Sequence, residues 1–290
     1  MKNNVSINNS NFKISFKMKK FKFLAIAAIA AATVMTSCSN DDEAVNNPAD
    51  GKLTFASQVT GDPQARATSG NTWDGTETVS VNVNGTVYPF SVTAAGVLTC
   101  ATQYWNDYTS VDAFAWYPAT YSYPADQSAG IQAADFIFAD KVTGITRTNY
   151  AATKLTFKHK TAKVSVTLQA GTGAPDLTGA TVKITGYTEV DAIDNTGTNP
   201  TGAITGKTPG WITPDATTNT ALLLPVALSN QNIFEVTLAN GQTYYYNSSY
   251  TFEGGKSYTF TITVNKTSLT VVSNTIEDWE SPTSVPGTAN

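Results

Sequence analysis

An all-β fold is predicted by three features of this sequence. Short segments in which apolar and polar residues alternate recur along the chain, and a period of two places every second side chain on one face of a strand. Turn signals separate several of these segments: Asn84-Gly85 and Asn240-Gly241 are typical of hairpins, and Gly254-Gly255 indicates a further turn. From residue 38 onward, no window of about 11 residues or more carries an apolar stripe with helical period and caps.

The chain begins with what we predict to be a leader and lipoprotein signal peptide, residues 1–37. A basic segment, Met18-Lys19-Lys20-Phe21-Lys22, is followed by the apolar run 23–34 and by small residues before Cys38. This pattern is typical of a signal peptide that ends in a lipobox. A transmembrane helix is the alternative, but the run is shorter than the ~20 residues that a bilayer requires. Both Met1 and Met18 remain open as the natural start.

Cys38 is the predicted lipid attachment point, and residues 38–50 are expected to form a lipidated polar tether. Acyl chains on this cysteine would anchor the protein to a membrane without spanning it. The acidic stretch 39–43 (Ser-Asn-Asp-Asp-Glu) resembles the export signal that directs Bacteroidetes lipoproteins to the outer face of the outer membrane. The expected location is therefore the cell surface, through a lipid anchor in the outer membrane.

The remainder is long enough for two domains of ordinary size. We expect two tandem β-sandwich domains, at residues 51–152 and 153–290, because turn signals separate short strands at nearly regular spacing. The strands are expected at 53–59, 79–83, 87–92, 111–116, 136–138, 154–157, 162–168, 181–185, 221–225, 233–238, 243–246, 257–264 and 269–272.

Charge and composition exclude several classes of function. From Cys38 onward the chain has 12 basic and 22 acidic residues, a net charge of −10, which makes nucleic acid a poor partner. The whole chain contains one histidine, His159, and two cysteines, so a histidine cluster cannot hold zinc. No Gly-x-Ser-x-Gly motif marks a serine nucleophile. We therefore predict a non-enzymatic protein with no catalytic residue, cofactor or metal.

Several stretches resemble the fimbrillin-like family of Bacteroidetes, which supplies the subunits of type V pili. The stretches that carry the resemblance are Ala65-Arg66-Ala67-Thr68 with Trp73, the segments 155–166 (LTFKHKTAKVSV) and 252–262 (FEGGKSYTFTI), and Ile276-Glu277-Asp278-Trp279. The resemblance implies two transthyretin-like sandwiches of Greek-key type in an exported lipoprotein. It also implies assembly with other fimbrial subunits into a surface filament by strand exchange.

In such pilins a trypsin-like protease cuts after an arginine near the N-terminus, and the first strand is lost. The matching residue is Arg66, so the implied cleavage site is the bond between Arg66 and Ala67. The strand that would be lost carries Leu53, Phe55 and Val59. Its removal would open an apolar groove with unpaired backbone groups, which can accept a strand from a neighbour. The alternative is that Arg66 is an ordinary loop arginine and is not cleaved.

The C-terminal segment 269–290 is the candidate donor strand, with Leu269, Val271, Ile276 and Trp279 as its apolar residues. The alternative is that residues 269–272 are simply the last strand of the second domain. A stalk, a tip and an anchor subunit all remain open.

A second hypothesis is a non-polymerising tip adhesin that binds a glycan or another receptor on a host or bacterial surface. Trp105 and Trp116 are its candidate ligand-binding residues, because flat aromatic faces stack on sugars. Packing within the strands is the favoured alternative for both. A structural role is likewise favoured for His159 over catalysis. A solvated turn is favoured over calcium binding for Asp191, Asp194 and Asn195.

Overall fold

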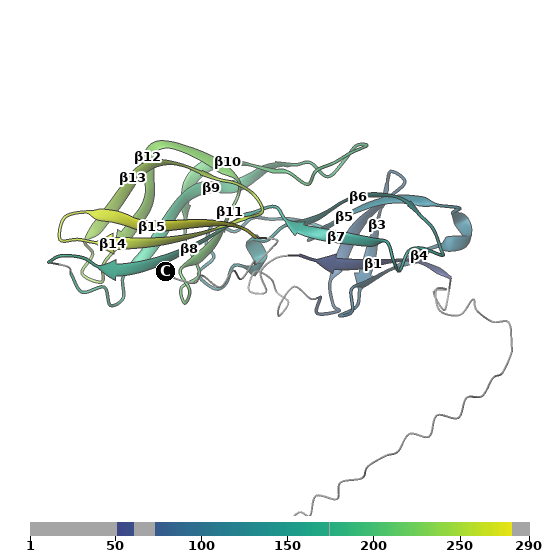
Figure 1. The fold of residues 1–290 in the computed structure, drawn as a ribbon, viewed down its shortest axis with the longest axis horizontal. Helices are drawn as coiled ribbons and strands as arrows, with labels where there is room; N and C mark the ends of the chain where they lie inside the picture. The colour runs from purple at the N-terminus through teal and green to yellow at the C-terminus, as the bar shows by residue number, and fades with distance from the viewer. Residues whose placement is uncertain (1–50, 61–72, 174, 280–290) are drawn as a thin grey trace, which may run out of the picture. The chain divides into compact units, whose positions relative to one another are not determined.

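The computed structural model describes residues 51–60, 73–173 and 175–279, and these form fifteen β-strands (Figure 1). The described helices are two 3-10 turns of 3 residues each, η1 (Trp105–Asp107) and η2 (Gln132–Ala134). The predicted all-β class is confirmed. Within the described ranges, no helix is sufficiently long and apolar to span a membrane.

The first seven strands form a closed barrel in the order β1-β4-β3-β2-β5-β6-β7. Its pairs are antiparallel except for β1 and β7, which run parallel and close the barrel. The strands are β1 (Lys52–Val59), β2 (Thr78–Val83), β3 (Thr86–Val92), β4 (Val97–Tyr104), β5 (Val111–Tyr117), β6 (Ile137–Ile145) and β7 (Lys154–His159).

The hairpin predicted at Asn84-Gly85 joins β2 to β3. Val83 lies opposite Thr86, so the turn has two residues. Asn84 and Gly85 have φ angles of +50° and +94°. Positive φ at both positions is the requirement of the tight turn that matches the twist of paired strands, which explains the Asn-Gly sequence.

The other eight strands form two four-stranded sheets, in the orders β10-β9-β12-β13 and β11-β8-β14-β15. Their shared core includes Phe234 and Phe260, whose ring centroids are 4.9 Å apart. The strands are β8 (Ala162–Ala170), β9 (Thr181–Ile193), β10 (Ile204–Ile212), β11 (Thr220–Leu223), β12 (Val226–Thr237), β13 (Thr243–Phe252), β14 (Lys256–Val264) and β15 (Leu269–Asp278).

The connection between β5 and β6 contacts the short edge strand β11. Gln127 is buried, its Nε2 donates to the Leu222 carbonyl (2.8 Å), and its Oε1 accepts from the Leu222 amide (2.8 Å). The Tyr123 hydroxyl donates to the same carbonyl (2.6 Å). Side chains thus satisfy backbone groups that an edge strand would otherwise leave open.

The expected boundary at 152/153 does not coincide with the change of sheet. It assigns β7 to the second half of the chain, whereas β7 pairs with β6 and with β1 in the barrel. The change of sheet lies between His159, the last residue of β7, and Ala162, the first residue of β8. The first seven strands join into one closed barrel, because the β1–β7 pair connects the two ends of their sheet. The division into two domains stays a prediction.

Candidate functional site

The first strand, β1, is hydrogen-bonded along both edges (Figure 1). It runs antiparallel to β4, with Phe55 opposite Leu98, and parallel to β7, with Ser57 opposite Leu155. Removing β1 would therefore expose the backbone edges of two strands, β4 and β7, with a strand-wide gap between them.

The barrel-facing side of β1 is apolar. Leu53 and Phe55 are fully buried and Val59 is nearly so. The Phe55 ring stacks on Phe90 at 5.4 Å between centroids and meets Trp105 edge-on at 6.0 Å. Burial of an aliphatic or aromatic side chain of this size stabilises a fold by about 1.5–3 kcal/mol. The three residues predicted for the displaced strand thus lie together in the barrel core.

Ser57 is a polar residue on the same buried side of β1. Its hydroxyl accepts a hydrogen bond from Trp73 Nε1 (3.0 Å) and donates one to the Gly96 carbonyl (2.7 Å). A Cβ on Gly96 would lie 2.5 Å from the Ser57 carbonyl oxygen, so the backbone there requires glycine. The sequence analysis missed Ser57, although a serine among alternating apolar residues is a signal for a buried hydroxyl with partners.

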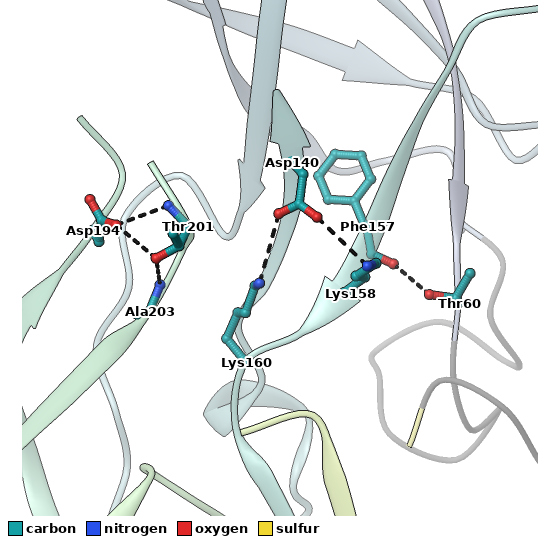
Figure 2. A network of polar contacts seen from close by, with 8 residues as sticks. All are labelled: Thr60, Asp140, Phe157, Lys158, Lys160, Asp194, Thr201 and Ala203. Carbon is teal, nitrogen blue, oxygen red and sulfur yellow. Dashed lines mark hydrogen bonds and ion pairs between the residues drawn. The ribbon is translucent and has the colours of Figure 1, made fainter. Parts of the chain in front are cut away.

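The C-terminal end of β1 is fixed to β7 at Thr60 (Figure 2). The Thr60 amide and hydroxyl both donate to the Phe157 carbonyl, at 3.0 and 3.1 Å. Beside it, Asp140 of β6 lies 3.6 Å from Lys158 Nζ and 4.0 Å from Lys160 Nζ. The chain then enters residues 61–72, so the implied cleavage site at Arg66 and Ala67 lies outside the described residues, as does Cys38.

The last strand, β15, differs from β1 in its pairing. Among the described residues it pairs with β14 alone, so its other edge is open. Leu269 is buried and Val271 is partly buried against the core. In contrast, Val272 and Ile276 are 59% and 57% exposed. The four predicted donor residues are therefore not equivalent: Ile276 contributes little to the core.

Trp279 follows β15 and is only 2% exposed. Its ring stacks on His159 with centroids 3.8 Å apart and planes 11° apart. His159 Nδ1 in turn lies 2.9 Å from Asp135 Oδ1, in a buried pair. The Trp279 amide donates to the Gly255 carbonyl (2.9 Å). His159 thus packs between a carboxylate and an indole, which agrees with the structural role favoured from the sequence.

Comparison with known proteins decides the family. A family model described as fimbrillin-like matches residues 65–279. The chain belongs to the fimbrillin-like family. As a fimbrial protein it acts at the cell surface. The family is one of fimbrial proteins, not of enzymes.

Solved structures share the fold of this chain. A candidate cell adhesion protein from Bacteroides uniformis is 22% identical, with a TM-score of 0.60 over 80% of this chain and 100% of the other. A second, from Bacteroides ovatus, is 16% identical, with a TM-score of 0.50 over 79% of this chain and 97% of the other. No curated protein sequence gives a significant match.

The two tryptophans considered for sugar stacking are buried in this structure. Trp105 is 2% exposed and packs on Phe55 in the barrel core. Trp116 is 7% exposed and stacks on Phe114 at 6.0 Å. A sugar needs an accessible ring face, so this burial argues against a ligand-binding role for either residue and for packing within the strands.

The Asp194 carboxylate is hydrogen-bonded to a nearby residue of its own loop (Figure 2). Asp194 Oδ2 accepts from the Thr201 amide (2.9 Å) and hydroxyl (2.7 Å). These two hydrogen bonds hold the pKa of Asp194 below its usual value. Throughout the described ranges, no three His, Cys, Asp or Glu side chains gather as a metal site. The Asp194 carboxylate thus has hydrogen-bond donors within its own loop.

Proposed function

We propose that this protein is a structural subunit of a surface filament, assembled by protease-triggered strand exchange. The observation that carries the proposal is the position of β1, which closes the barrel through both edges and precedes the segment that contains Arg66. The region matched by the family model begins at residue 65 and so leaves β1 out. Proteolysis after Arg66 would separate β1 from the rest of the barrel.

The cut is required because β1 is held by many contacts at once. It pairs on two edges and buries Leu53, Phe55 and Val59. While β1 is part of the same chain, rebinding is intramolecular and therefore favoured by a high effective concentration. After cleavage, β1 becomes a separate peptide that a donor strand at high local concentration can replace.

The resulting groove would bind a strand by two kinds of interaction. The open edges of β4 and β7 would offer backbone donors and acceptors, and each bond restored contributes about 0.5–1.5 kcal/mol net. The apolar positions of Leu53 and Phe55 would bury new side chains at ~25 cal/mol per Å². Partners are then other fimbrial subunits, of the same or a related kind.

Treatment of the purified chain with trypsin tests the proposal. Wild-type protein should give ladders that resist sodium dodecyl sulfate, and Arg66→Gln protein should stay monomeric because its cleavage site is absent. Mass spectrometry must show Ala67 as the new N-terminus. Complete cleavage at this bond with only monomers present would refute strand exchange.

Before cleavage, the subunit is attached through Cys38, whose acyl chains would hold the N-terminal segment in the outer membrane. Cleavage after Arg66 would then release the barrel from this anchor, because Cys38 lies on the N-terminal side of the cut. Cells that express the wild type should incorporate labelled palmitate into the protein, whereas Cys38→Ala cells should not. Label that persists in Cys38→Ala protein would contradict the anchor.

A non-polymerising adhesin is the second candidate function, and one surface favours it. Trp211 and Tyr245 lie 6.4 Å apart between ring centroids, and Tyr245 is 50% exposed. Cross-strand register places Tyr245, Glu235 and Lys183 on one face of their sheet. Trp211 is partly buried, and the exposed Tyr245 ring beside charged groups suits a sugar. Glycan-array binding that Tyr245→Ala abolishes, in a chain that forms no ladders, would favour this function over the filament.

A further inference from the structure

Strand β13 is an edge strand whose composition does not protect it from pairing. Among the described strands it pairs with β12 alone, so the backbone donors and acceptors of its other edge are open. Its ten residues, Thr-Tyr-Tyr-Tyr-Asn-Ser-Ser-Tyr-Thr-Phe, include no charged residue and no proline. Proteins usually protect an open edge from pairing with another strand by charges, proline, a bulge or a short length.

The other three edge strands of the two four-stranded sheets differ from β13. β10 contains Lys207 and Pro209. β11 has only four residues, and Gln127 hydrogen-bonds to its backbone. β15 ends in Glu277 and Asp278, and it is the candidate donor strand. Among the described edges of these sheets, β13 alone combines a long strand with a composition that does not oppose pairing.

β13 is also continuous along its length. Its pairing with β12 shifts register twice, between Leu228 and Gln231 and between Asn232 and Phe234 of β12. At both places the extra residue belongs to β12, because three steps in β12 match two in β13 at the first shift and two steps match one at the second. A bulge within an edge strand bends that strand away from a partner. The edge of β13 therefore stays regular.

The sequence of β13 is nearly symmetric about Asn247. Thr243 and Thr251 are equally far from Asn247, and so are Tyr244 and Tyr250. When a twofold axis relates two antiparallel strands, residues at equal distances from the axis lie opposite each other. A second β13 paired about Asn247 would thus place threonine opposite threonine and tyrosine opposite tyrosine. At the two remaining pairs of positions a tyrosine would lie opposite a serine, so each large ring meets a small side chain.

We propose that β13 of one copy pairs antiparallel with β13 of a second copy, with the twofold axis at Asn247. The sheets β10-β9-β12-β13 of the two copies would then form one continuous sheet. The partner is a second copy because the strand is self-complementary and because two uncharged edges do not repel each other. This inference does not depend on the proposed strand exchange, since neither β1 nor β15 takes part in it.

The covered face of the sheet restricts the register. Tyr245 and Asn247 are exposed, whereas Tyr244 and Phe252 point to the buried face. Residues opposite each other on paired strands point to the same face, so a shift by one residue would place exposed side chains opposite buried ones. The axis must therefore pass through a residue and not between two. Asn247 is the central residue of β13 that gives a pair of identical residues on each face.

A twofold interface has a defined consequence for assembly. It closes after two copies and cannot extend a filament by itself. Strand exchange would join subunits along one filament, whereas β13 would join a subunit to one of a neighbouring filament, side by side. The β13 pair is noncovalent and exchanges no buried strand. It should therefore dissociate in sodium dodecyl sulfate and add no band to the ladders of strand exchange.

A disulfide at the axis tests the proposed pairing. The background is the full chain with Cys38→Ala and Arg66→Gln, which removes the lipidation residue and the implied cleavage site, while Cys100 is buried. Opposite residues of antiparallel strands have Cα atoms about 4.5–5.5 Å apart, a distance that a disulfide spans. Asn247→Cys should form a covalent dimer under mild oxidation. Thr205→Cys, at an exposed position of the edge strand β10, is the matched control and should stay monomeric.

Two further variants test the register. In the same background, Thr243→Cys and Thr251→Cys should each remain monomeric alone and should form a disulfide-linked dimer when they are mixed. Each threonine lies opposite the other in the proposed pair and far from its own copy. Equal cross-linking of Thr243→Cys alone would refute the axis at Asn247.

Sedimentation equilibrium measures the association without cross-linking. The Cys38→Ala, Arg66→Gln chain should show a monomer–dimer equilibrium. Asn247→Lys, which places two ammonium groups opposite each other, should weaken dimerisation about tenfold or more, and the control Thr205→Lys should not. A monomer at every concentration, or a dimer that Asn247→Lys leaves unchanged, would refute the pairing of β13. Neither result would affect strand exchange, which the trypsin ladders test separately.

Discussion

β1 and β15 are the first and last described strands of the chain, and their surroundings differ. β1 is hydrogen-bonded on both edges and buries its alternate side chains in the barrel. In the described part of the chain, β15 pairs on one edge only, and Val272 and Ile276 are mostly exposed. The difference teaches that the number of paired edges and covered faces, more than apolar content, sets what a strand contributes to stability. A strand paired on both edges closes the barrel, whereas a strand paired on one edge leaves backbone groups available to a partner.

The largest effect that follows from this comparison is expected at Phe55. Phe55→Ala should lower the free energy of unfolding by about 3–5 kcal/mol, because it leaves a cavity against Phe90 and Trp105. The matched change in β15, Ile276→Ala, should alter it by less than about 0.5 kcal/mol. Urea denaturation of both variants measures the contrast. Equal destabilisation would mean that β15 is as integral to the fold as β1.

The next effect concerns the end of β15. Trp279→Ala should destabilise this end by about 3 kcal/mol, since it removes the indole that stacks on His159. Hydrogen exchange followed by mass spectrometry should show faster exchange in β15 and little change in β1. Ile276→Ala serves as the control with unchanged exchange. Uniform acceleration over all strands would contradict local anchoring by Trp279.

The sequence predicted most strands because alternation and turn chemistry act locally. It missed β4 and β10, and β10 shows the reason. Gly206, Pro209 and Gly210 interrupt the pattern, yet a Cβ on either glycine would collide with side chains of β9, namely Tyr187 or Thr188. An edge strand also tolerates a proline. Close approach between strands thus requires residues that, in sequence, resemble a loop.

The site was predictable only in part. The apolar pattern indicated that Leu53 and Phe55 share a face, but pairing of β1 with β7 joins segments about a hundred residues apart and leaves no local signal. Sequence alone also could not distinguish buried from exposed tryptophans. Trp105 is buried and packs on Phe55 in the barrel core. Trp211 is only partly buried, with the exposed Tyr245 as its aromatic neighbour. These distinctions depend on tertiary contacts, which periodicity does not encode.

A smaller effect is expected at Ser57, a buried polar residue on the same side of β1 as Phe55. Ser57→Ala should cost about 1–2 kcal/mol, because Trp73 Nε1 and the Gly96 carbonyl lose their shared hydroxyl. Ser273→Ala in β15 is the matched control and should be nearly neutral in the free subunit, since Ser273 is exposed. Denaturant midpoints of the two variants check this. A neutral Ser57→Ala would mean that these two hydrogen bonds contribute little to the stability of the barrel.

The smallest effect is electrostatic and concerns the pair between Lys256 of β14 and Asp278 of β15. The hydrogen bond and the charge of Asp278 raise the pKa of Lys256 above its usual 10.5. A raised pKa means that the pair stabilises β15 fully below that usual value and loses its effect as pH rises through the higher, folded-state value. Asp278→Asn should return the pKa of Lys256 toward normal, as measured by NMR titration of its Cε. The difference in urea midpoint between Asp278→Asn and wild type should be small, because the pair is exposed, and should vanish at the alkaline end. The difference in urea midpoint between Ser57→Ala and wild type should stay constant over the same range, because the serine hydroxyl does not titrate there. The pH dependence therefore distinguishes the exposed ion pair of β15 from the buried hydrogen bonds of β1.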